Sequence, residues 1–402
     1  MKIFVVNCGS SSFKFQLINM ESSAILCSGL VERISAATGN LTYKQHPGTK
    51  NSRELEEERA FANHSEGIIR VMELLTDETY GVMKNLDEIS ACGHRGVMGA
   101  EKFTKPTIVE AGMLKTLKSL SILAPLHNPP TIQGMEIMNE MLPCPSVAVF
   151  DTEFHSTMPE HTYKYAIPEK MYDEFGIRRY GFHGTSHRYV SEQAADFMGK
   201  DRDKVNLITC HLGNGSSVTA VQDGRCVDTS MGLTPLSGVV MGTRSGDIDP
   251  AIYPFLARQT KNNIEEIDAM LNAESGLKGI CSMNDMRDIH SARAHGDPKA
   301  ELAFQMFCYS IRKYIGAYFA VLDRVDSIVF TGGIGENDDI ARSSICAGLS
   351  GLGIEIDAQK NSIRSPESRS IATEQATVDT MIIPTNEELA IATATMNTLK
   401  VA

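Results

Sequence analysis

A stretch in the middle of the chain combines a strand pattern with backbone that could bind an anion. Residues 206–221 run from four mostly apolar residues through Cys210 and His211 into a Gly-Asn-Gly-Ser-Ser turn and an alternating tail. The glycines at 213 and 215 let backbone amides approach a ligand closely and adopt positive φ. Because successive amides in such a turn form a concave anion site, we predict a strand, an anion-binding turn and a second strand.

Two more stretches show the same order of features. Residues 2–18 contain an apolar strand, an Asn-Cys-Gly-Ser-Ser-Ser turn and an alternating strand, and residues 329–337 place a Gly-Gly-Ile-Gly turn after an apolar strand. Any one of them alone is typical of an ordinary turn, but the three together favour a duplicated nucleotide-binding core. None is a P-loop, which needs G-x-x-x-x-G-K-[ST]. The first two lead into strands, whereas a Rossmann fingerprint leads into a helix.

Charged side chains at special positions could supply further phosphate chemistry. Arg95 follows an apolar strand, and an arginine fork binds a carboxylate or phosphate at two points. Arg244 is the only charged residue in the stretch 230–246. Asp151 follows the buried strand predicted over Ser146–Phe150, at the carboxyl end where α/β proteins place functional groups. The simpler explanations are a surface salt bridge for Arg95 and a helix cap for Asp151.

Two histidines and two oxygen ligands complete the set of candidates. His183 lies among glycines and His127 lies before two prolines, so each has a fixed backbone and is either a core histidine or a ligand-binding one. Asn7 and Glu387 carry oxygens of the kind that magnesium takes, with phosphates and waters filling the remaining positions. The sequence alone does not place these two residues together.

The elements that must position these residues alternate between strands and helices. Helical spacing and capping signals predict helices over residues 64–75, 108–120, 131–141, 168–175, from Thr185 or Ser186 to about 198, from 249–250 onward, 264–271 and 299–322, and one that opens at 385. Thr385 with Glu388 fits a capping box, which leaves Glu387 free. Residues 36–63 are predicted as a polar loop. The alternation predicts an α/β fold, with a domain boundary near residues 151–154.

Length and composition narrow the class of protein. The 402 residues are too many for one ordinary core, so we expect two domains. A net charge of −12 argues against a nucleic acid or an anionic membrane as partner. No apolar run of 18 residues is present, and we therefore expect a cytoplasmic protein. The nine scattered cysteines form no CxxC pair and predict reduced thiols rather than a zinc site.

Motifs along the whole chain carry a resemblance to a known family. They are NCGSSSFK at 7–14, LAPLHNPP at 123–130, FDT at 150–152, RYGFHGTSH at 179–187, HLGNGSS at 211–217, MGTRSGD at 241–247, FTGGIGEN at 330–337 and PTNEE at 384–388. Together they resemble the acetate kinases of the acetokinase family, which belongs to the acetate and sugar kinase, Hsp70 and actin superfamily.

The resemblance implies two duplicated ribonuclease-H-like domains with a cleft between them, and a homodimer. Residues 1–151 would form an acyl and metal domain joined by residues 385–402, and residues 152–384 a nucleotide-binding and dimerisation domain. The return of the last helix would bring Glu387 near Asn7, where both hold Mg²⁺, for which Mn²⁺ can substitute. The implied reaction is direct in-line transfer from ATP to acetate, giving ADP and acetyl phosphate.

The resemblance also implies a role for each candidate residue. The catalytic residues are Asp151, His183 and Arg244. The acyl substrate is bound by Arg95, Val97, Leu126, His127, Phe182 and Pro235. The nucleotide is bound by Ser12, Lys14, His211, Leu212, Gly213, Asn214, Gly215, Asp285, Met286, Arg287, Gly333, Ile334, Gly335, Glu336 and Asn337.

The chain departs from the family pattern near the implied acyl site. The family has Arg-Val-Val-His-Gly-Gly where this chain has Arg95-Gly-Val-Met98-Gly-Ala100, and it has glutamate where this chain has Ser237. Acyl specificity is therefore open between acetate and the longer propionate or butyrate. Pyrophosphate as phosphoryl donor is also open. So is a nucleotide-gated protein of the actin or Hsp70 kind, although such a protein would not need both Arg95 and Arg244.

Overall fold

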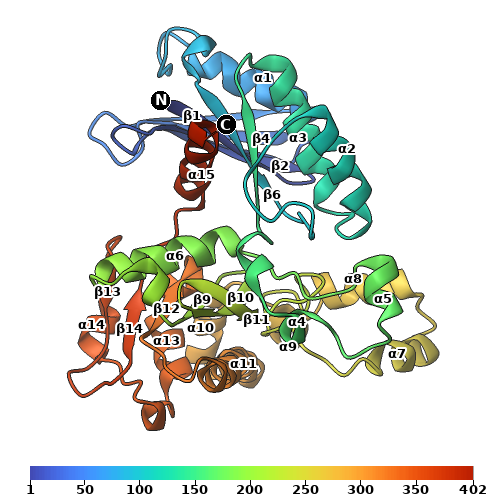
Figure 1. Cartoon of the computed structure of the whole chain (residues 1–402), viewed down its shortest axis with the longest axis vertical. Helices are drawn as coiled ribbons and strands as arrows, with labels where there is room; N and C mark the ends of the chain where they lie inside the picture. Colours follow the sequence, from blue (N-terminus) through green and yellow to red (C-terminus); the bar gives the residue numbers. More distant parts are fainter. Residues whose placement is uncertain (402) are drawn as a thin grey trace. The chain divides into compact units, whose positions relative to one another are not determined.

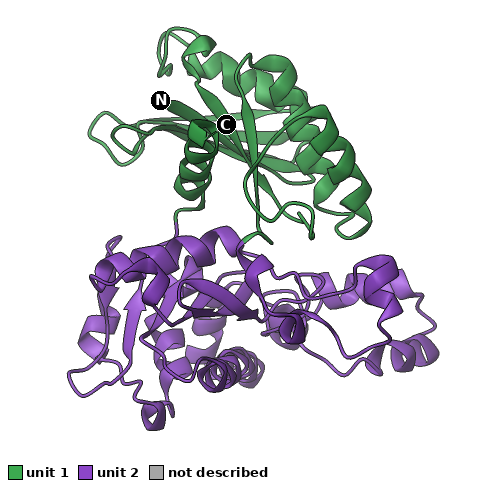
Figure 2. Cartoon of the chain, in the orientation of Figure 1, with its two compact units in different colours: residues 1–153, 386–402 green, residues 154–385 purple. Residues whose placement is uncertain are grey.

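The computed structural model describes residues 1–401, and the chain divides into two compact units (Figure 2). Unit 1 is made of Met1–Glu153 and Asn386–Ala402, and unit 2 is Phe154–Thr385. Each unit is built on one β-sheet with helices packed on it (Figure 1). This architecture confirms the predicted α/β fold class. No helix in residues 1–401 is long and apolar enough to cross a membrane.

The sheet of unit 1 has the strand order β5-β4-β3-β2-β1-β6-β8-β7. Its strands are β1 (Lys2–Cys8), β2 (Ser12–Asn19), β3 (Ala24–Glu32), β4 (Gly39–Gln45), β5 (Arg53–Arg59), β6 (Ala91–Gly96), β7 (Thr107–Ile108) and β8 (Ser146–Phe150). β1 to β5 pair antiparallel with one another in turn. β6 runs parallel to β1, and β8 runs parallel to β6. The carboxyl ends of β6 and β8 therefore meet at one edge of the sheet.

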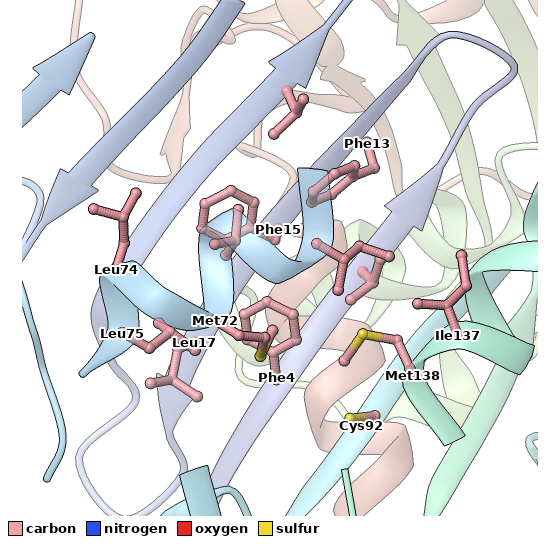
Figure 3. Packing of buried hydrophobic residues seen from close by; sticks show 14 of the residues in the cluster. Phe4, Phe13, Phe15, Leu17, Met72, Leu74, Leu75, Cys92, Ile137 and Met138 are labelled. Carbon is pink, nitrogen blue, oxygen red and sulfur yellow. The ribbon is translucent and has the colours of Figure 1, made fainter. Parts of the chain in front are cut away.

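Helices cover both faces of this sheet. They are α1 (His64–Leu75), α2 (Ala111–Ser119), α3 (Asn128–Met141) and α15 (Glu387–Val401), with 3₁₀ helices at Leu86–Glu88 and Leu120–Ile122. On one face, Phe4 and Phe15 of the sheet pack with Met72 of α1 and Met138 of α3 (Figure 3). On the other face, α15 buries its apolar residues against β1 and β6. Because it is covered on both sides, β1 is a nearly continuous apolar run.

The sheet of unit 2 has the strand order β11-β10-β9-β12-β14-β13. Its strands are β9 (Leu207–Leu212), β10 (Ser216–Gln222), β11 (Arg225–Thr229), β12 (Ser327–Thr331), β13 (Arg369–Ser370) and β14 (Asp379–Ile382). β9, β10 and β11 pair antiparallel, whereas β12 is parallel to β9 and β14 is parallel to β12. The same directions occur in the order β3-β2-β1-β6-β8 of unit 1. This repeat confirms the predicted duplication.

Two long helices pack on opposite faces of the second sheet (Figure 1). α6 contributes Val190 and Ala194 to one core, and α11 packs on β10 and β9. Along α11, apolar residues at helical spacing form a buried stripe that belongs to the core: Phe304, Phe307, Ile311, Ile315, Tyr318 and Leu322. The helices of this unit are α4 (Glu160–Tyr163), α5 (Lys170–Phe175), α6 (Gly184–Phe197), α7 (Ile252–Thr260), α8 (Ile264–Ala273), α9 (Gly276–Cys281), α10 (Met286–Ala294), α11 (Pro298–Leu322), α12 (Gly332–Asn337), α13 (Asp339–Cys346) and α14 (Ala358–Ser362), with 3₁₀ helices at Phe154–Thr157, Arg202–Lys204 and Ser350–Leu352.

The prediction of a loop over residues 36–63 is wrong, because β4 and β5 lie there. Leu41 and Tyr43 alternate with more exposed residues along β4 and are buried in the core of unit 1. β5 is the edge strand, and its run of glutamates is largely exposed. Charged side chains on an edge strand discourage pairing with another chain. The glutamate-rich segment, whose sequence resembles a solvated loop, therefore forms a protected edge of the sheet.

Several helices begin later than predicted, and the reason is clear for α2 and α7. Ile108 pairs with Val147 as part of β7, so α2 begins only at Ala111. The Asp249 carboxylate accepts the Ala251 N–H at 2.9 Å and forms a turn before α7, which begins at Ile252. A strand partner in the first case and a side-chain bond in the second hold the first predicted residues outside the helix.

Candidate active site

Arg95 and Asp151 meet at the carboxyl ends of β6 and β8. The parallel pairing sets Arg95 opposite Val149, and the Asp151 N–H donates to the Gly96 carbonyl at 2.9 Å. Arg95 Nε and Nη2 donate to Asp151 Oδ1 and Oδ2 at 3.0 and 2.7 Å. The Asp151 side chain is 3% exposed and that of Arg95 is 21% exposed. The structure thus places the predicted catalytic carboxylate in a hydrogen-bonded ion pair with the predicted substrate-binding arginine.

The surroundings of Arg95 keep its guanidinium charged. Burial alone lowers its pKa, but the carboxylates of Asp151 and Glu387 act in the opposite direction, and the pKa of Arg95 lies above its ordinary value. Glu387 Oε2 is 3.8 Å from Arg95 Nε. A guanidinium has five N–H donors, and two of them are bound to Asp151, which leaves three for an anionic ligand.

The last helix brings its first residues to the sheet of unit 1, because α15 packs on β1, β6 and β8 (Figure 1). Asn386 Oδ1 accepts the Leu389 N–H at 3.0 Å. Glu388 Oε1 lies 2.5 Å from Lys14 Nζ. The predicted capping box of Thr385 with Glu388 is therefore wrong: Asn386 caps the helix, and Glu388 is held by an ion pair with Lys14.

Asn7 and Glu387 remain the candidates for a magnesium site in unit 1. Asn7 lies opposite Lys14 in the β1–β2 pair, and Lys14 is the residue that Glu388 contacts. The first turn of α15 therefore lies beside this hairpin. An amide oxygen and a carboxylate fit Mg²⁺, which usually keeps several waters and binds substrate phosphates. Within residues 1–401, no three His, Cys, Asp or Glu side chains are grouped to hold a metal.

The residues predicted for the acyl pocket are divided between the units. Val97, Leu126 and His127 belong to unit 1, whereas Phe182 and Pro235 belong to unit 2. The Leu126 side chain is 73% exposed, and Phe182 is 3% exposed. Because the five residues come from two separate units, a shared pocket stays a prediction.

Packing explains one departure from the family pattern, the glycine at position 96. A Cβ on Gly96 would lie 2.4 Å from Phe150 Cδ1, and the Phe150 ring stacks on Phe103 with ring centroids 5.1 Å apart. The Phe150 ring thus occupies the space that a side chain at position 96 would need. Met98 is fully buried, and its N–H and carbonyl bond the Asn128 side chain at 3.2 and 3.1 Å.

The β9–β10 hairpin forms with its turn at Gly213–Gly215, as predicted, but the turn has a different backbone. Neither Gly213 nor Gly215 has a positive φ, so that part of the prediction is wrong. The Gly213 N–H donates to Ser216 Oγ at 3.2 Å and stabilises the turn internally. A Cβ on Gly215 would lie 3.4 Å from Arg244 Nη1 and 3.5 Å from His183 Nε2. The structure therefore brings Gly215, Arg244 and His183 together in unit 2.

Arg244 is a cation without a carboxylate partner in residues 1–401. The one hydrogen bond of its guanidinium joins Nη1 to Met241 Sδ at 4.0 Å. Burial lowers the pKa of Arg244 below its ordinary value. A partly buried charge that the protein leaves uncompensated costs stability, so its presence indicates an anionic ligand. Arg95 and Arg244 thus differ, since only Arg95 already has a counter-ion.

His183 has a strained backbone next to this cluster. Its φ is 58°, a left-handed conformation that residues other than glycine rarely adopt, and it is the residue before α6. The predicted cap at Thr185 or Ser186 is wrong, because Ser186 Oγ bonds His211 Nδ1 at 2.8 Å instead. The His183 ring stacks on that of His211 with centroids 4.3 Å apart. Such strain in a fold is typical of a functional position.

Sequence reasoning missed three polar residues behind His183. Ser217 Oγ lies 2.8 Å from His183 Nδ1, and it also contacts His187, which contacts Thr209. The available signal was the i, i+4 spacing of His183 and His187 at the start of a helix, which places them on one face. The buried hydroxyls of Thr209 and Ser217 gave no signal, since they fit an ordinary β-hairpin.

The third glycine turn opens α12 after β12. Gly332 has a φ of 77°, and a Cβ on it would lie 2.7 Å from the Leu212 carbonyl oxygen, so glycine is required there. Glu336 Oε1 accepts the Gly332 N–H at 2.9 Å and the Thr385 N–H at 3.1 Å. Glu336 therefore holds the turn, while Gly333 is exposed at its outer side.

The segment 285–287 forms the start of α10. Asp285 accepts the Arg287 N–H at 2.9 Å, and the Arg287 guanidinium bonds the same carboxylate. The bond from the Arg287 side chain, followed by that from its N–H, lowers the pKa of Asp285 to about 2. Met286 is buried, and the Arg287 side chain is 90% exposed. Asp285 and Arg287 are thus engaged with each other, and their nucleotide contacts stay a prediction.

Comparison with known proteins agrees with the motifs of the sequence. A family model described as the acetokinase family matches residues 2–393. The chain belongs to the acetokinase family. It is 53% identical over 401 residues to the acetate kinase of Oleidesulfovibrio alaskensis, with 100% of both chains covered.

Solved structures of acetokinase-family proteins share the fold. The acetate kinase of Porphyromonas gingivalis is 39% identical, with a TM-score of 0.94 and 99% of both chains covered. A propionate kinase from Francisella tularensis is 42% identical, with a TM-score of 0.92 and coverage of 98% of this chain and 99% of that one. These likenesses confirm the predicted fold of the actin and sugar kinase type.

Proposed function

We propose that this member of the acetokinase family reversibly transfers the γ-phosphoryl group of ATP to acetate, giving acetyl phosphate and ADP. The protein is then a phosphotransferase with a carboxyl group as acceptor. The observation that carries the proposal is the 53% identity, over the whole of both chains, to a relative named acetate kinase.

Electrostatics supports this reaction class. Acetate is already ionised at neutral pH, so the acceptor needs no strong general base. The difficulty lies in bringing two anions together, and catalysis of phosphoryl transfer is mainly positioning and neutralisation of charge. In a chain of net charge −12, Arg95 and Arg244 supply cationic groups at defined places. We propose direct in-line transfer without a phosphoenzyme.

Unit 1 is proposed to hold the acyl substrate. Arg95 offers its remaining N–H groups to the acyl carboxylate or phosphate, and Asp151 fixes the plane of that fork through two parallel bonds. Asp151 then acts by orienting Arg95 rather than by moving a proton. His127 is proposed to assist in binding. The side chains proposed to surround the methyl group are Val97, Leu126, Phe182 and Pro235.

Asn7 and Glu387 are proposed to hold Mg²⁺, or Mn²⁺ in its place. Their support is the position of the first turn of α15 beside the β1–β2 hairpin. The ion supplies positive charge to the phosphates when it is bound. Ser12 and Lys14, at the start of β2, are proposed to lie near the same phosphates.

Unit 2 is proposed to hold the nucleotide and to stabilise the transferring group. Arg244 and His183, which lie beside Gly215, are proposed to meet the charge that develops on the phosphoryl group. The turn around His211–Gly215, the segment 285–287 and the turn 333–337 are proposed to bind ATP. The phosphate side of ATP is expected at the glycine turns, which present backbone close to the ligand.

Propionate is the second candidate acceptor. The observation in its favour is the TM-score of 0.92 and 42% identity to a propionate kinase. One methylene discriminates between substrates by only about 1–3 kcal/mol. Comparison of kcat/KM for acetate and propionate, on the same preparation, decides between them.

A homodimer and a cytoplasmic location complete the proposal. Along α11, Leu302, Met306 and Tyr309 form an exposed apolar strip at helical spacing, which is typical of a surface that another chain covers. All nine cysteines are free, as in a reducing compartment. The mass of the protein in solution tests the dimer.

The proposed function is tested by trapping acetyl phosphate with hydroxylamine in the presence of ATP, Mg²⁺ and acetate. The proposal predicts acetohydroxamate in proportion to ADP, and loss of both when acetate is omitted. ADP release that does not depend on acetate would favour a nucleotide-gated protein. Replacement of ATP by pyrophosphate tests the second possible donor, and we expect no product from it.

A further inference from the structure

A chain of hydrogen bonds in unit 2 ends on His183. Thr209 Oγ1 lies 2.7 Å from His187 Nδ1, His187 Nε2 lies 2.7 Å from Ser217 Oγ, and Ser217 Oγ lies 2.8 Å from His183 Nδ1. Thr209 comes from β9, Ser217 from β10 and His187 from α6, which packs on β9. Thr209, His187 and Ser217 are 0% exposed. Water therefore does not compete for these bonds.

Burial determines the direction in which the protons point. In residues 1–401, the Thr209 hydroxyl makes one hydrogen bond, and it is to His187. Its proton must point at His187 Nδ1, because a buried hydroxyl proton without an acceptor is costly. Burial, with a smaller effect of His155 and His211, lowers the pKa of His187 well below its ordinary value. The neutral His187 ring therefore carries its single proton on Nε2.

The positions of the remaining protons in this series of hydrogen bonds follow from the position of the Thr209 proton. His187 Nε2–H donates to Ser217 Oγ, so the Ser217 proton is free to donate to His183 Nδ1. With Nδ1 as an acceptor, the proton of a neutral His183 lies on Nε2. That nitrogen is the one beside Gly215, where a Cβ would lie 3.5 Å from His183 Nε2 and 3.4 Å from Arg244 Nη1.

We infer that Ser217 is a positioning residue that holds His183 as the neutral tautomer protonated on Nε2 and aims this N–H at the phosphoryl site beside Arg244. The inference rests on the proposed function, which puts the transferring group there. A neutral imidazole N–H can stabilise developing negative charge. Neutrality also avoids a second positive charge next to Arg244, which has no carboxylate partner in the described chain.

The bond from Ser217 also opposes a second proton on His183. Protonation of Nδ1 would turn it into a donor facing a hydroxyl that already donates to it, so Ser217 would have to give up that bond. The titratable groups that face His183 include Arg244, His211 and His187. Ser217→Ala removes the Ser217 bond from both His183 and His187, so the two rings are followed together in the titration.

The test is ¹⁵N NMR of histidine side chains in the full-length protein without substrates. We expect His183 and His187 to be neutral at pH 8, each with its proton on Nε2. In Ser217→Ala the second proton of His183 should bind at higher pH than in the unaltered protein. A His183 that carries its proton on Nδ1, or that titrates identically in Ser217→Ala, would overturn the inference.

A second pair of variants tests the far end of the chain without touching the site. Thr209→Val removes the donor to His187 Nδ1 at almost constant shape and should shift the ¹⁵N resonance of that nitrogen toward the value of an acceptor without a hydrogen bond, whereas Thr209→Ser should not. The matched control is Thr219→Val, because Thr219 lies directly opposite Thr209, is equally buried, and bonds Thr229 instead of a histidine. A His187 Nδ1 resonance that is unchanged in Thr209→Val would contradict the proposed chain of hydrogen bonds.

Kinetics separates the inference from the proposed function. Ser217→Ala should lower kcat by about 10-fold or more, up to the roughly 10³-fold that loss of one positioned donor costs, with little change in the KM for ATP. Thr219→Val should leave kcat unchanged. A normal kcat in Ser217→Ala would overturn the positioning role. If the protein forms no acetyl phosphate at all, the proposed function fails while the tautomers measured by NMR remain as inferred.

Discussion

Arg95 and Asp151 form a two-point ion pair, with bonds of 3.0 and 2.7 Å, between the ends of two adjacent parallel strands. Asp151 is almost completely buried, and Arg95 keeps N–H groups that face away from it. The pair therefore differs from a surface salt bridge, which was the simpler explanation for Arg95. The pair supports the proposal that the carboxylate fixes the orientation of the arginine, a role that needs no proton transfer.

Removal of Asp151 should affect both stability and turnover. Asp151→Ala leaves a partly buried guanidinium without its main partner and should lower the free energy of unfolding by about 3 kcal/mol, as expected for a broken buried pair. Chemical denaturation of Asp151→Ala, Arg95→Met and the double variant gives the coupling energy, which should be about 1–3 kcal/mol. Additive effects would mean that the pair does not act as a unit. Asp151→Asn should lower kcat more than it changes the KM for ATP.

Arg244 should show the opposite balance between stability and activity. Its pKa is lowered by burial, so the charged form is less favourable in the folded chain than in the unfolded chain over the whole range in which arginine is protonated. Arg244→Met should therefore raise the free energy of unfolding by roughly 1 kcal/mol in the absence of ligands. The same variant should lose at least about 10²-fold in kcat, with little change in the KM for ATP.

Arg244→Lys distinguishes charge from geometry. Lysine keeps the charge but lacks the planar fork, so it should restore kcat only partly. Steady-state kinetics and thermal denaturation of the two variants provide the measurements. The proposal is that Arg244 stabilises the transition state. An Arg244→Met protein that is less stable, or whose activity is lowered only through weaker substrate binding, would contradict it.

Glu387 and its neighbour Glu388 make a matched pair for the magnesium proposal. Glu388 is held by Lys14, whereas Glu387 lies 3.8 Å from Arg95 and is proposed as the metal ligand. Glu387→Gln should raise the Mg²⁺ concentration needed for half-maximal activity by about 10-fold, the lower end of the cost of disturbing a metal site. Glu388→Gln should not. The same Mg²⁺ dependence in both variants would remove Glu387 from the site.

Ala100 carries a strain that glycine would relieve. Its φ is 47°, in the left-handed region that costs a residue with a Cβ about 1–2 kcal/mol. The family has glycine at this position, so Ala100→Gly should raise the melting temperature, with a gain of about 1 kcal/mol. Ala347, with a φ of −58°, is the control, and Ala347→Gly should lower stability instead. A destabilised Ala100→Gly would show that the strain is offset by contacts of its methyl group.

Much of the fold could be predicted from local patterns. The 3.6-residue spacing in His64–Leu75 and the apolar run Ser146–Phe150 mark these elements to the residue, because each buries one continuous apolar surface. β5 could not be recognised, since an edge strand buries little and its glutamates suit a loop equally well. The glycine turns indicated the duplication, although Gly213 and Gly215 do not have the positive φ that glycine permits.

The candidate site was predicted less completely than the fold. Arg95 and Asp151 stood out because each lies at the carboxyl end of a predicted strand, and the register of β6 and β8 then brings them together. The bonds of Glu388 could not be foreseen, since its partner Lys14 is distant in sequence and a local capping box was the simpler explanation. The hydroxyls of Thr209 and Ser217 could not be recognised for a similar reason, because they reach the histidines only when β9, β10 and α6 are packed together.

Acetate dependence of ATP consumption distinguishes a carboxylate phosphotransferase from a nucleotide-gated protein. ³¹P NMR of the protein with ATP and Mg²⁺ follows ATP, ADP and any phosphorylated product in one sample. We expect ATP to be consumed only after acetate is added, with one acetyl phosphate formed for each ADP. Arg244→Met, if folded, should show at most about a hundredth of that rate. Steady release of inorganic phosphate without acetate, at the rate seen with acetate, would contradict the proposal that acetate is the phosphoryl acceptor.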